Sequence, residues 1–283
     1  MEPFLLQLGA DRSLHGGRVG DGRDIVLIHG ALTTHVDWLE QPLGELARRG
    51  RVFAVDRPGH GQSRRPRFKA GPRDQAAQIR EGLLRLGVKR PVLVGHSLGG
   101  MVALAWAEQW PEEVAGLVLL APITHGEPRP LEHLALGPRA LPLIGPMLAE
   151  VGRWTTDGAL LAFAQRAMFH PHPPPAAWLA RFPEKEVRKP EATVAEGEDA
   201  AALLPGSPAG MLDLRRVMAP VSIVAGRRDL VVDHRRHAEA LARQLPQADL
   251  RLLDGVGHMP HHCALEAVLA AFHDLVDVGQ AAA

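Results

Sequence analysis

The sequence of 283 residues contains neither tyrosine nor asparagine. Without tyrosine, no phenol can serve as a catalytic acid, base or nucleophile. Without asparagine, N-glycosylation is excluded, as is an asparagine side chain that donates to an oxyanion. Lysine is also rare, because the 32 basic residues include only four lysines: Lys69, Lys89, Lys185 and Lys189. The absent and rare residues have AT-rich codons, so this bias indicates a GC-rich coding sequence.

The chain also lacks an excess of charge and any long hydrophobic run. Its 32 basic and 32 acidic residues give a formal net charge of zero, which offers no electrostatic reason to expect nucleic acid or an anionic membrane as a partner. No stretch approaches 18 uninterrupted apolar residues, so we expect no membrane span. Hydrophobic residues make up 46% of the chain, which is enough for a substantial core.

Cysteine usage and the first residues bear on the compartment. Cys263 is the only cysteine, so no disulfide can form within the chain. Residues 1–12 lack the basic start and the apolar run of a secretory signal. We therefore expect a cytoplasmic protein. No feature of the sequence sets its oligomeric state.

Short apolar segments alternate with amphipathic ones along most of the chain. This alternation predicts a mostly parallel, doubly wound α/β sheet with helices on both faces. The expected strands are 24–28, 51–55, 91–94, 114–120, 221–225 and 249–253, and the expected helices are 38–48, 75–86, 98–109, 234–244 and 264–276.

The alternation stops between Pro122 and Leu214. This stretch is rich in proline and glycine, and we expect helices over 156–168 and 176–182 on either side of the Pro171–Pro175 break. We interpret 122–214 as an inserted helical cap on a core formed by 1–121 and 215–283. Long insertions at the carboxyl end of a sheet strand commonly build a binding site.

A Gly-X-Ser-X-Gly pattern follows one of the predicted strands. Gly95-His96-Ser97-Leu98-Gly99 lies between a strand and a helix, where a tight and strained turn would project the Ser97 hydroxyl above the sheet. Small neighbours at 95 and 99 permit the close packing that such a turn needs. The context predicts a serine nucleophile.

A serine hydroxyl needs a base, and the base needs an acid that orients it. His258 follows the last predicted strand, in a loop that leaves the same sheet edge as Ser97. Asp229 follows the strand before it, and the order Ser, Asp, His is the one found in α/β-hydrolases. Asp233 is the alternative acid, although it is also placed to cap the helix expected from His234.

The oxyanion donors are expected on the main chain. The loop His29-Gly30-Ala31-Leu32 follows the first buried strand, and such a loop supplies one amide while the residue after the nucleophile supplies the other. These would be the backbone N–H groups of Ala31 and Leu98.

Taken in order, these motifs resemble the α/β-hydrolase superfamily, in particular its capped serine esterases, lipases and lactonases. The matching pieces span nearly the whole chain: His29-Gly30, Asp56-Arg57-Pro58-Gly59-His60-Gly61-Gln62-Ser63, Gly95 to Gly100, Gly226 to Asp229, and Gly257-His258. The resemblance implies Ser97 as nucleophile, Asp229 as acid and His258 as base. Serine at this position disfavours the dehalogenase and epoxide-hydrolase branches, which use aspartate.

Other candidates are weaker. Candidate pocket residues for an apolar acyl or alcohol group are Leu32, Trp38, His96, Met147, Phe163, Met168 and Trp178. His170 with His172, and His261 with His262 and Cys263, lack the spacing of a structural zinc site, so neither a metal nor a cofactor is expected.

The sequence thus predicts a serine hydrolase that cleaves small carboxylic esters through an acyl-enzyme. A lactonase, thioesterase, acyltransferase, perhydrolase or C–C bond hydrolase would use the same site. A non-catalytic hydrolase-like binding protein is the alternative of another class, and its usual mark is a broken triad.

Overall fold

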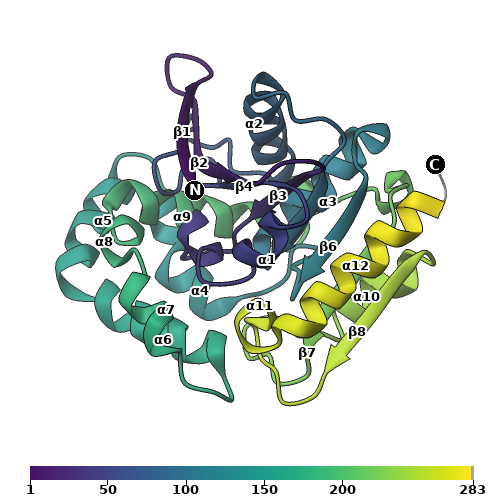
Figure 1. The fold of residues 1–283 in the computed structure, drawn as a ribbon. Helices are drawn as coiled ribbons and strands as arrows, with labels where there is room; N and C mark the ends of the chain where they lie inside the picture. The colour runs from purple at the N-terminus through teal and green to yellow at the C-terminus, as the bar shows by residue number, and fades with distance from the viewer. Residues whose placement is uncertain (282–283) are drawn as a thin grey trace.

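An eight-stranded sheet forms the centre of the computed structural model, which describes residues 1–281 (Figure 1). The strand order is β1-β2-β4-β3-β5-β6-β7-β8, in which β2 is antiparallel to both of its neighbours, β1 and β4, and the other neighbouring strands are parallel. The strands are β1 (Glu2–Gln7), β2 (Ser13–Val19), β3 (Asp24–Ile28), β4 (Arg51–Val55), β5 (Val92–His96), β6 (Gly116–Leu120), β7 (Val221–Gly226) and β8 (Ala248–Leu253). The expected α/β fold class is confirmed.

The register aligns the carboxyl ends of the central strands. Ile28 of β3 pairs with Gly95 of β5, and His96 of β5 pairs with Leu120 of β6. Gly226 at the end of β7 pairs with Leu253 of β8. The loops that follow β3, β5, β7 and β8 therefore leave one edge of the sheet, where ligands bind in open α/β sheets.

Alternate residues of the central strands pack into two separate hydrophobic cores, one on each face of the sheet. Val26 and Ile28 pack on one face, whereas Ile25 and Leu27 pack on the other, as the two-residue repeat of a strand requires. The first face is covered by α2 (Pro72–Arg85), α3 (Leu98–Gln109) and α10 (Ala238–Gln244). The second is covered by α1 (Leu43–Ala47) and α12 (Leu265–Ala281).

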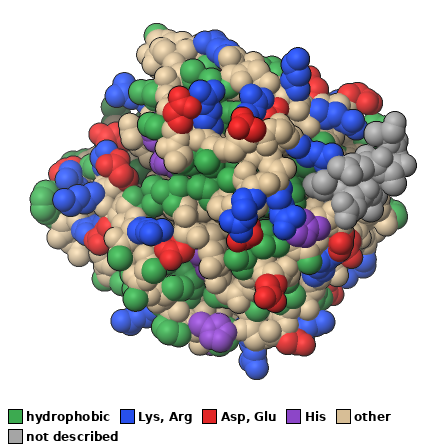
Figure 2. Space-filling model, in the orientation of Figure 1, with side chains coloured by type: hydrophobic (Ala, Val, Ile, Leu, Met, Phe, Trp, Pro, Cys, Tyr) green, Lys and Arg blue, Asp and Glu red, His purple; other side chains and the backbone are tan. Residues whose placement is uncertain are grey.

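The chain between β6 and β7 is helical. It contains α4 (Pro130–Ala135), η3 (Gly137–Ala140), α5 (Ile144–Thr155), α6 (Asp157–Phe169), α7 (Ala176–Arg181), α8 (Glu184–Val187), α9 (Pro190–Ala202), η4 (Pro208–Gly210) and η5 (Leu214–Arg216). Large apolar side chains of this segment reach the surface, and the left half of Figure 2 shows apolar groups among charged ones. Within residues 1–281, no helix has the length and apolar character needed to cross a bilayer.

The sequence-based elements were wrong or incomplete in several places. The helix expected over 38–48 is divided into η1 (His35–Trp38) and α1, with Pro42 between them, because proline disfavours a helix interior. The helix expected from His234 begins at Ala238, and α11 (Pro260–Cys263) precedes the last helix. The hairpin β1–β2 was not predicted. It contains Gly16, where a Cβ atom would lie 2.3 Å from the Ala54 carbonyl oxygen.

Candidate active site

Ser97 occupies a strained turn between β5 and α3. Its backbone has φ 53° and ψ −119°, a conformation that is rare for any residue other than glycine. The main chain holds it there, since Ser97 N donates to the Leu120 carbonyl (2.9 Å) and the Ser97 carbonyl accepts from Ile123 N (3.0 Å). Only 3% of the serine is exposed, so it lies beneath other parts of the chain.

The two glycines of the motif permit the turn sterically. A Cβ atom on Gly95 would lie 2.5 Å from the Gly99 carbonyl oxygen. A Cβ atom on Gly99 would lie 2.2 Å from the Ile28 carbonyl oxygen. Each contact is with backbone, which cannot move aside as a flexible side chain would. The glycines therefore let α3 start directly against β3 and β5.

His258 and Asp229 are joined by a hydrogen bond. His258 Nδ1 lies 2.7 Å from Asp229 Oδ2, and both side chains are almost fully buried. The other carboxylate oxygen, Oδ1, accepts from the backbone N–H groups of Val231 (2.7 Å) and Val232 (2.9 Å), which fixes the orientation of Asp229. Asp233 Oδ1 instead accepts from Arg235 N at 2.9 Å. Of the two candidate acids, Asp229 is the one bonded to the histidine.

The loop that carries His258 is tied to the serine turn. His96, the residue before Ser97, contacts the His258 carbonyl oxygen through Nε2 at 2.8 Å, and the two imidazole rings lie 4.8 Å apart. On the other side, His258 N donates to the Met168 carbonyl oxygen (3.1 Å). The structure thus brings Ser97, His258 and Asp229 to the same sheet edge, and among the described contacts Nε2 of His258 forms no hydrogen bond.

The expected oxyanion donors lie beside the serine. A Cβ atom on Gly30 would lie 3.1 Å from Ser97 Cβ, so the loop after β3 passes directly against Ser97. Among the described residues, neither Ala31 N nor Leu98 N donates a hydrogen bond to another protein group. Leu98 is the first residue of α3, where backbone N–H groups lack an intrahelical acceptor. Both amides are therefore available for a ligand.

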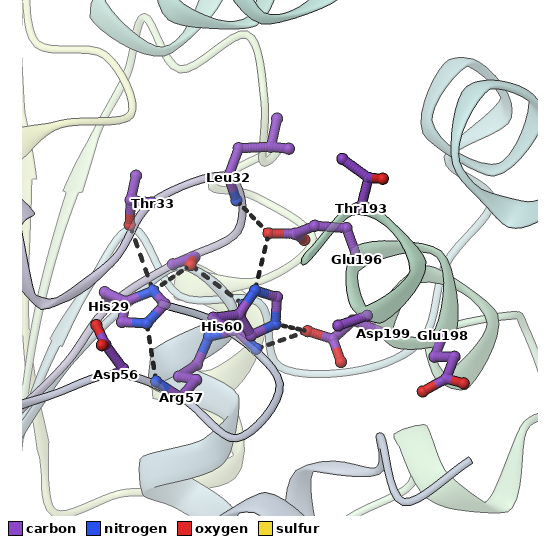
Figure 3. Close-up of polar contacts among 12 residues, drawn as sticks. His29, Leu32, Thr33, Asp56, Arg57, His60, Thr193, Glu196, Glu198 and Asp199 are labelled. Atoms are coloured by element: carbon purple, nitrogen blue, oxygen red, sulfur yellow. Dashed lines mark hydrogen bonds and ion pairs between the residues drawn. The ribbon is translucent and has the colours of Figure 1, made fainter. Parts of the chain in front are cut away.

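The next amide in this loop is already engaged. Leu32 N donates to Oε1 of Glu196 on α9 at 2.6 Å (Figure 3), and Leu32 has a positive φ of 55°. Leu32, named as a pocket candidate, is thus a point of contact between the loop after β3 and the helical segment.

The pocket candidates separate into three groups. Met168 and Trp178 pack with Phe169 and Met259 in a cluster next to His258. Trp38, also named as a pocket candidate, is fully buried in the core on the α1–α12 face of the sheet. Met147 and Phe163, the remaining candidates from this segment, are 60% and 63% exposed.

The His261–His262 pair contacts a buried carboxylate that the sequence did not single out. Asp37 of η1 accepts hydrogen bonds from Nε2 of both imidazoles (3.0 Å each) and from Trp178 Nε1 (2.9 Å). Burial alone would raise the pKa of Asp37, but His261 and His262 outweigh it and hold that pKa well below its usual value. The cluster joins η1, α7 and the turn after His258.

Three groups place histidine and carboxylate atoms close enough together for a metal ion: His15 with His35 and Asp56, Asp37 with His96 and His261, and His60 with Glu196 and Asp199. In each group the carboxylates already accept hydrogen bonds from imidazole, guanidinium or amide donors. These contacts favour structural hydrogen bonding, and we assign no metal ligand.

Comparisons with known proteins agree with this architecture. The model of the alpha/beta hydrolase fold family matches residues 25–263. An uncharacterized protein of Mycobacterium tuberculosis is 31% identical over 89% of this chain and 76% of its own length. A pimeloyl-[acyl-carrier protein] methyl ester esterase of Nitrosomonas europaea is 27% identical over 93% of this chain and 99% of its own length.

A solved structure supports the same conclusion about the fold. The thermophilic esterase of Thermogutta terrifontis superimposes with a TM-score of 0.73 and 22% identity, over 99% of this chain and 100% of its own. The likeness of the two structures agrees with the family match over most of the chain, and that match identifies the protein as an enzyme of the α/β-hydrolase fold family.

Proposed function

We propose that this protein is a serine hydrolase that cleaves small carboxylic esters through an acyl-enzyme. The observation that carries the proposal is the strained Ser97 turn at the same sheet edge as the His258–Asp229 hydrogen bond of 2.7 Å. A serine nucleophile and its histidine base need this combination of a serine turn and an oriented imidazole. The methyl ester esterase and the thermophilic esterase among the similar proteins support the same reaction class.

In the proposed reaction, Ser97 Oγ attacks the ester carbonyl while its proton passes to His258 Nε2. The carbonyl oxygen becomes an oxyanion that accepts hydrogen bonds from the N–H groups of Ala31 and Leu98. The intermediate then collapses, the ester C–O bond breaks, and His258 returns the proton to the leaving alcohol. Asp229 holds Nδ1–H of His258, which keeps Nε2 free to accept a proton.

Deacylation repeats these steps with water. His258 Nε2 takes a proton from the water, whose oxygen attacks the acyl carbonyl in the same oxyanion site. The second intermediate releases the carboxylic acid, and Ser97 Oγ recovers its proton from His258. Because each proton is passed and returned, the reaction needs no cofactor.

We further propose that residues 122–214 act as a cap on a core of 1–121 and 215–283. Two contacts support the proposal: the segment contributes Met168 and Trp178 to the cluster next to His258, and it contributes Glu196 to the loop after β3. An apolar acyl or alcohol group of the substrate would lie between cap and core. The cytoplasm, a reducing compartment compatible with the single Cys263, is the proposed location.

The proposal is tested with p-nitrophenyl acetate and butyrate. The wild type should release nitrophenol with an initial burst equal to one equivalent per site, and Ser97→Ala should lose several orders of magnitude in kcat/KM. Turnover that survives in Ser97→Ala would contradict the proposal. If the wild type bound a ligand but showed no turnover, the interpretation as a non-catalytic binding protein would be favoured.

The triad is shared by lactonases, thioesterases, acyltransferases, perhydrolases and C–C bond hydrolases. A panel of esters, lactones and acyl thioesters, compared by kcat/KM, ranks these reactions against ester hydrolysis. Esters should give the highest values.

A further inference from the structure

A buried carboxyl of the cap contacts the oxyanion loop. Glu196 of α9 is 3% exposed, and its Oε1 accepts the hydrogen bond from Leu32 N at 2.6 Å (Figure 3). Leu32 directly follows Ala31, whose amide is a donor in the proposed oxyanion hole. The inference below therefore rests on the proposed function.

The contact fixes one peptide plane next to the donor. The peptide between Ala31 and Leu32 is planar, so directing its N–H toward Glu196 directs the Ala31 carbonyl the opposite way. If this peptide turned over, a carbonyl oxygen would face the Glu196 carboxyl, and the two oxygens would repel each other. Leu32 also has a positive φ, which a leucine keeps only where surrounding contacts hold it.

The helix that presents Glu196 is itself anchored to the core. Asp199, one turn further along α9, accepts from Arg57 Nη1 (2.6 Å), Arg65 Nη1 (2.8 Å) and Gln75 Nε2 (3.1 Å), and lies 3.0 Å from His60 Nε2 (Figure 3 shows the Arg57 and His60 contacts). Arg57 is fully buried. This network sets the position of α9, and hence of Glu196, relative to the loops after β3 and β4.

Glu196 differs from Glu198 and Asp199 on α9 because, within residues 1–281, no guanidinium is hydrogen-bonded to it. Apart from Leu32 N, the polar contact it makes is with His60 Nδ1, 3.4 Å from Oε1. Burial raises the pKa of Glu196 to about 8, and the carboxylates of Asp199 and Glu132 act in the same direction, against the charge of Arg57 and the hydrogen bond from Leu32 N, which both lower it. Burial also lowers the pKa of His60 to about 4, with Arg57 contributing. The raised pKa favours the uncharged form of the Glu196 carboxyl near neutral pH.

We propose that Glu196 is a positioning residue that acts through Leu32 to hold the Ala31 amide in the oxyanion hole, and that it does so in its uncharged form. An acceptor without charge orients the loop and adds no negative charge next to the site where the oxyanion develops. Because the Leu32–Glu196 hydrogen bond joins the loop after β3 to the cap, the geometry of the oxyanion hole also depends on the position of the cap relative to the core. A cap helix that is displaced loses the Leu32 bond.

The first test compares Glu196→Gln with Glu196→Ala at pH 7. Glutamine keeps an uncharged acceptor for Leu32 N, so kcat should stay within about threefold of wild type. Alanine removes the acceptor, so kcat should fall by about 10- to 100-fold, less than the loss of an entire oxyanion donor, while KM changes by less than about threefold. Equal kcat values for Glu196→Ala and wild type would overturn the proposal.

Glu198→Ala is the matched control on the same helix. Glu198 is also buried, but it is bonded to Arg65 (3.1 Å) and to Arg67 rather than to the loop after β3. This variant should lower the melting temperature while leaving kcat of the folded enzyme unchanged. If it lowers kcat as much as Glu196→Ala does, the effect is a general loss of cap stability and the proposal fails.

The pH profile of kcat distinguishes the effect of the charge on Glu196 from the effect of its hydrogen bond to Leu32 N. As pH rises through about 8, Glu196 ionises in the wild type and places a negative charge beside the hole, so kcat should decline. The groups that face this carboxyl are Arg57 and His60 from the turn after β4, Glu132 from α4 and Asp199 from α9. Glu196→Gln lacks the ionisation and should keep its kcat to higher pH. Superimposable profiles would overturn the proposal that the uncharged form acts.

Hydrogen exchange of the Leu32 amide provides a readout that does not need turnover. The amide should be protected in the wild type and in Glu196→Gln, and it should exchange at least tenfold faster in Glu196→Ala. Unchanged exchange in Glu196→Ala would show that Glu196 does not hold the loop. If exchange responds but the wild type hydrolyses no ester, the proposed function fails, and the catalytic role of Glu196 fails with it.

Discussion

His258 Nδ1 and Asp229 Oδ2 lie 2.7 Å apart, and the second oxygen of Asp229 is held by two backbone N–H groups. This arrangement leaves Asp229 one orientation, in which it fixes the imidazole with Nδ1 protonated. Asp229→Asn should therefore lower kcat by about 10³- to 10⁴-fold, because the amide can donate to Nδ1 and favour the wrong tautomer. Steady-state kinetics with a p-nitrophenyl ester measure the effect.

Asp233→Asn is the control for that substitution. Asp233 accepts from Arg235 N and from no atom of His258 among the described contacts. We expect kcat within about threefold of wild type and a small loss of stability from the weakened turn. A large kcat defect in Asp233→Asn with a mild one in Asp229→Asn would reverse the assignment of the acid.

The serine turn should not tolerate a methyl group at Gly99. A Cβ atom there would lie 2.2 Å from the Ile28 carbonyl oxygen and 2.5 Å from that of His29. Either β3 with the loop after it or the start of α3 would therefore have to shift. Gly99→Ala should lower the free energy of unfolding by about 1–3 kcal/mol or more, measured by urea denaturation. In contrast, Gly44→Ala on α1, where the added atom meets nothing within 4 Å, should be neutral or stabilising by about 0.5–1 kcal/mol. Equal effects would mean that the close packing does not constrain position 99.

The buried histidines should make the fold sensitive to mild acid. Burial and the neighbouring His262 lower the pKa of His261 to about 4, so the folded protein keeps this imidazole neutral. The unfolded chain, with a histidine pKa of about 6.5, binds a proton first, and stability falls as pH decreases from about 6.5 toward 4. His60, whose pKa is also lowered to about 4, acts in the same sense.

Denaturation midpoints measured from pH 7 to pH 4 check this dependence. His261→Gln should show a smaller loss of stability over this range than the wild type, because one of the histidines is gone. His172→Gln, which removes an exposed imidazole, is the matched control. The account of His261 is contradicted by a pH dependence in His261→Gln that equals that of the wild type.

The anchor of α9 should be costly to break. Asp199→Ala leaves the fully buried Arg57 without its carboxylate, which typically costs about 3–5 kcal/mol. Glu186→Ala removes an exposed partner of Lys189 and should cost no more than about 0.5 kcal/mol. Thermal or urea unfolding of the two variants separates these expectations. Similar losses in both would mean that the buried network contributes no more than a surface pair.

The sequence predicts those site residues whose position depends only on the strand that directly precedes them. Ser97, Asp229 and His258 each follow a strand, and parallel strands bring their carboxyl ends to one edge, so strand patterns alone place the three together. The parallel strands of the sheet were predicted for the same reason. The antiparallel hairpin was not, because its Gly16-Gly17 pair reads as a breaker until the close approach of β4 is known.

Contacts between residues that are far apart in the sequence leave no pattern from which they could be predicted. Arg57 and Asp199 are 142 positions apart, and Asp37 and His261 are 224 apart. Neither pair belongs to a periodic pattern, and Glu196 lies in a helix whose charged residues suggest a solvated surface. Their burial becomes evident only when the helical segment between β6 and β7 is placed against the sheet and its loops. An aromatic residue in the loop after β3 can turn toward either a pocket or the core, so the sequence alone does not reveal that Trp38 packs in the core.

Covalent labelling of Ser97 tests the central claim most directly. The folded wild type is treated with a fluorophosphonate, digested, and examined by mass spectrometry for the modified residue. We predict one label per chain on Ser97, lost in Ser97→Ala and strongly slowed in Asp229→Asn. A folded wild type that takes no label, or takes it on a residue other than Ser97, would contradict the account of this protein as a serine hydrolase.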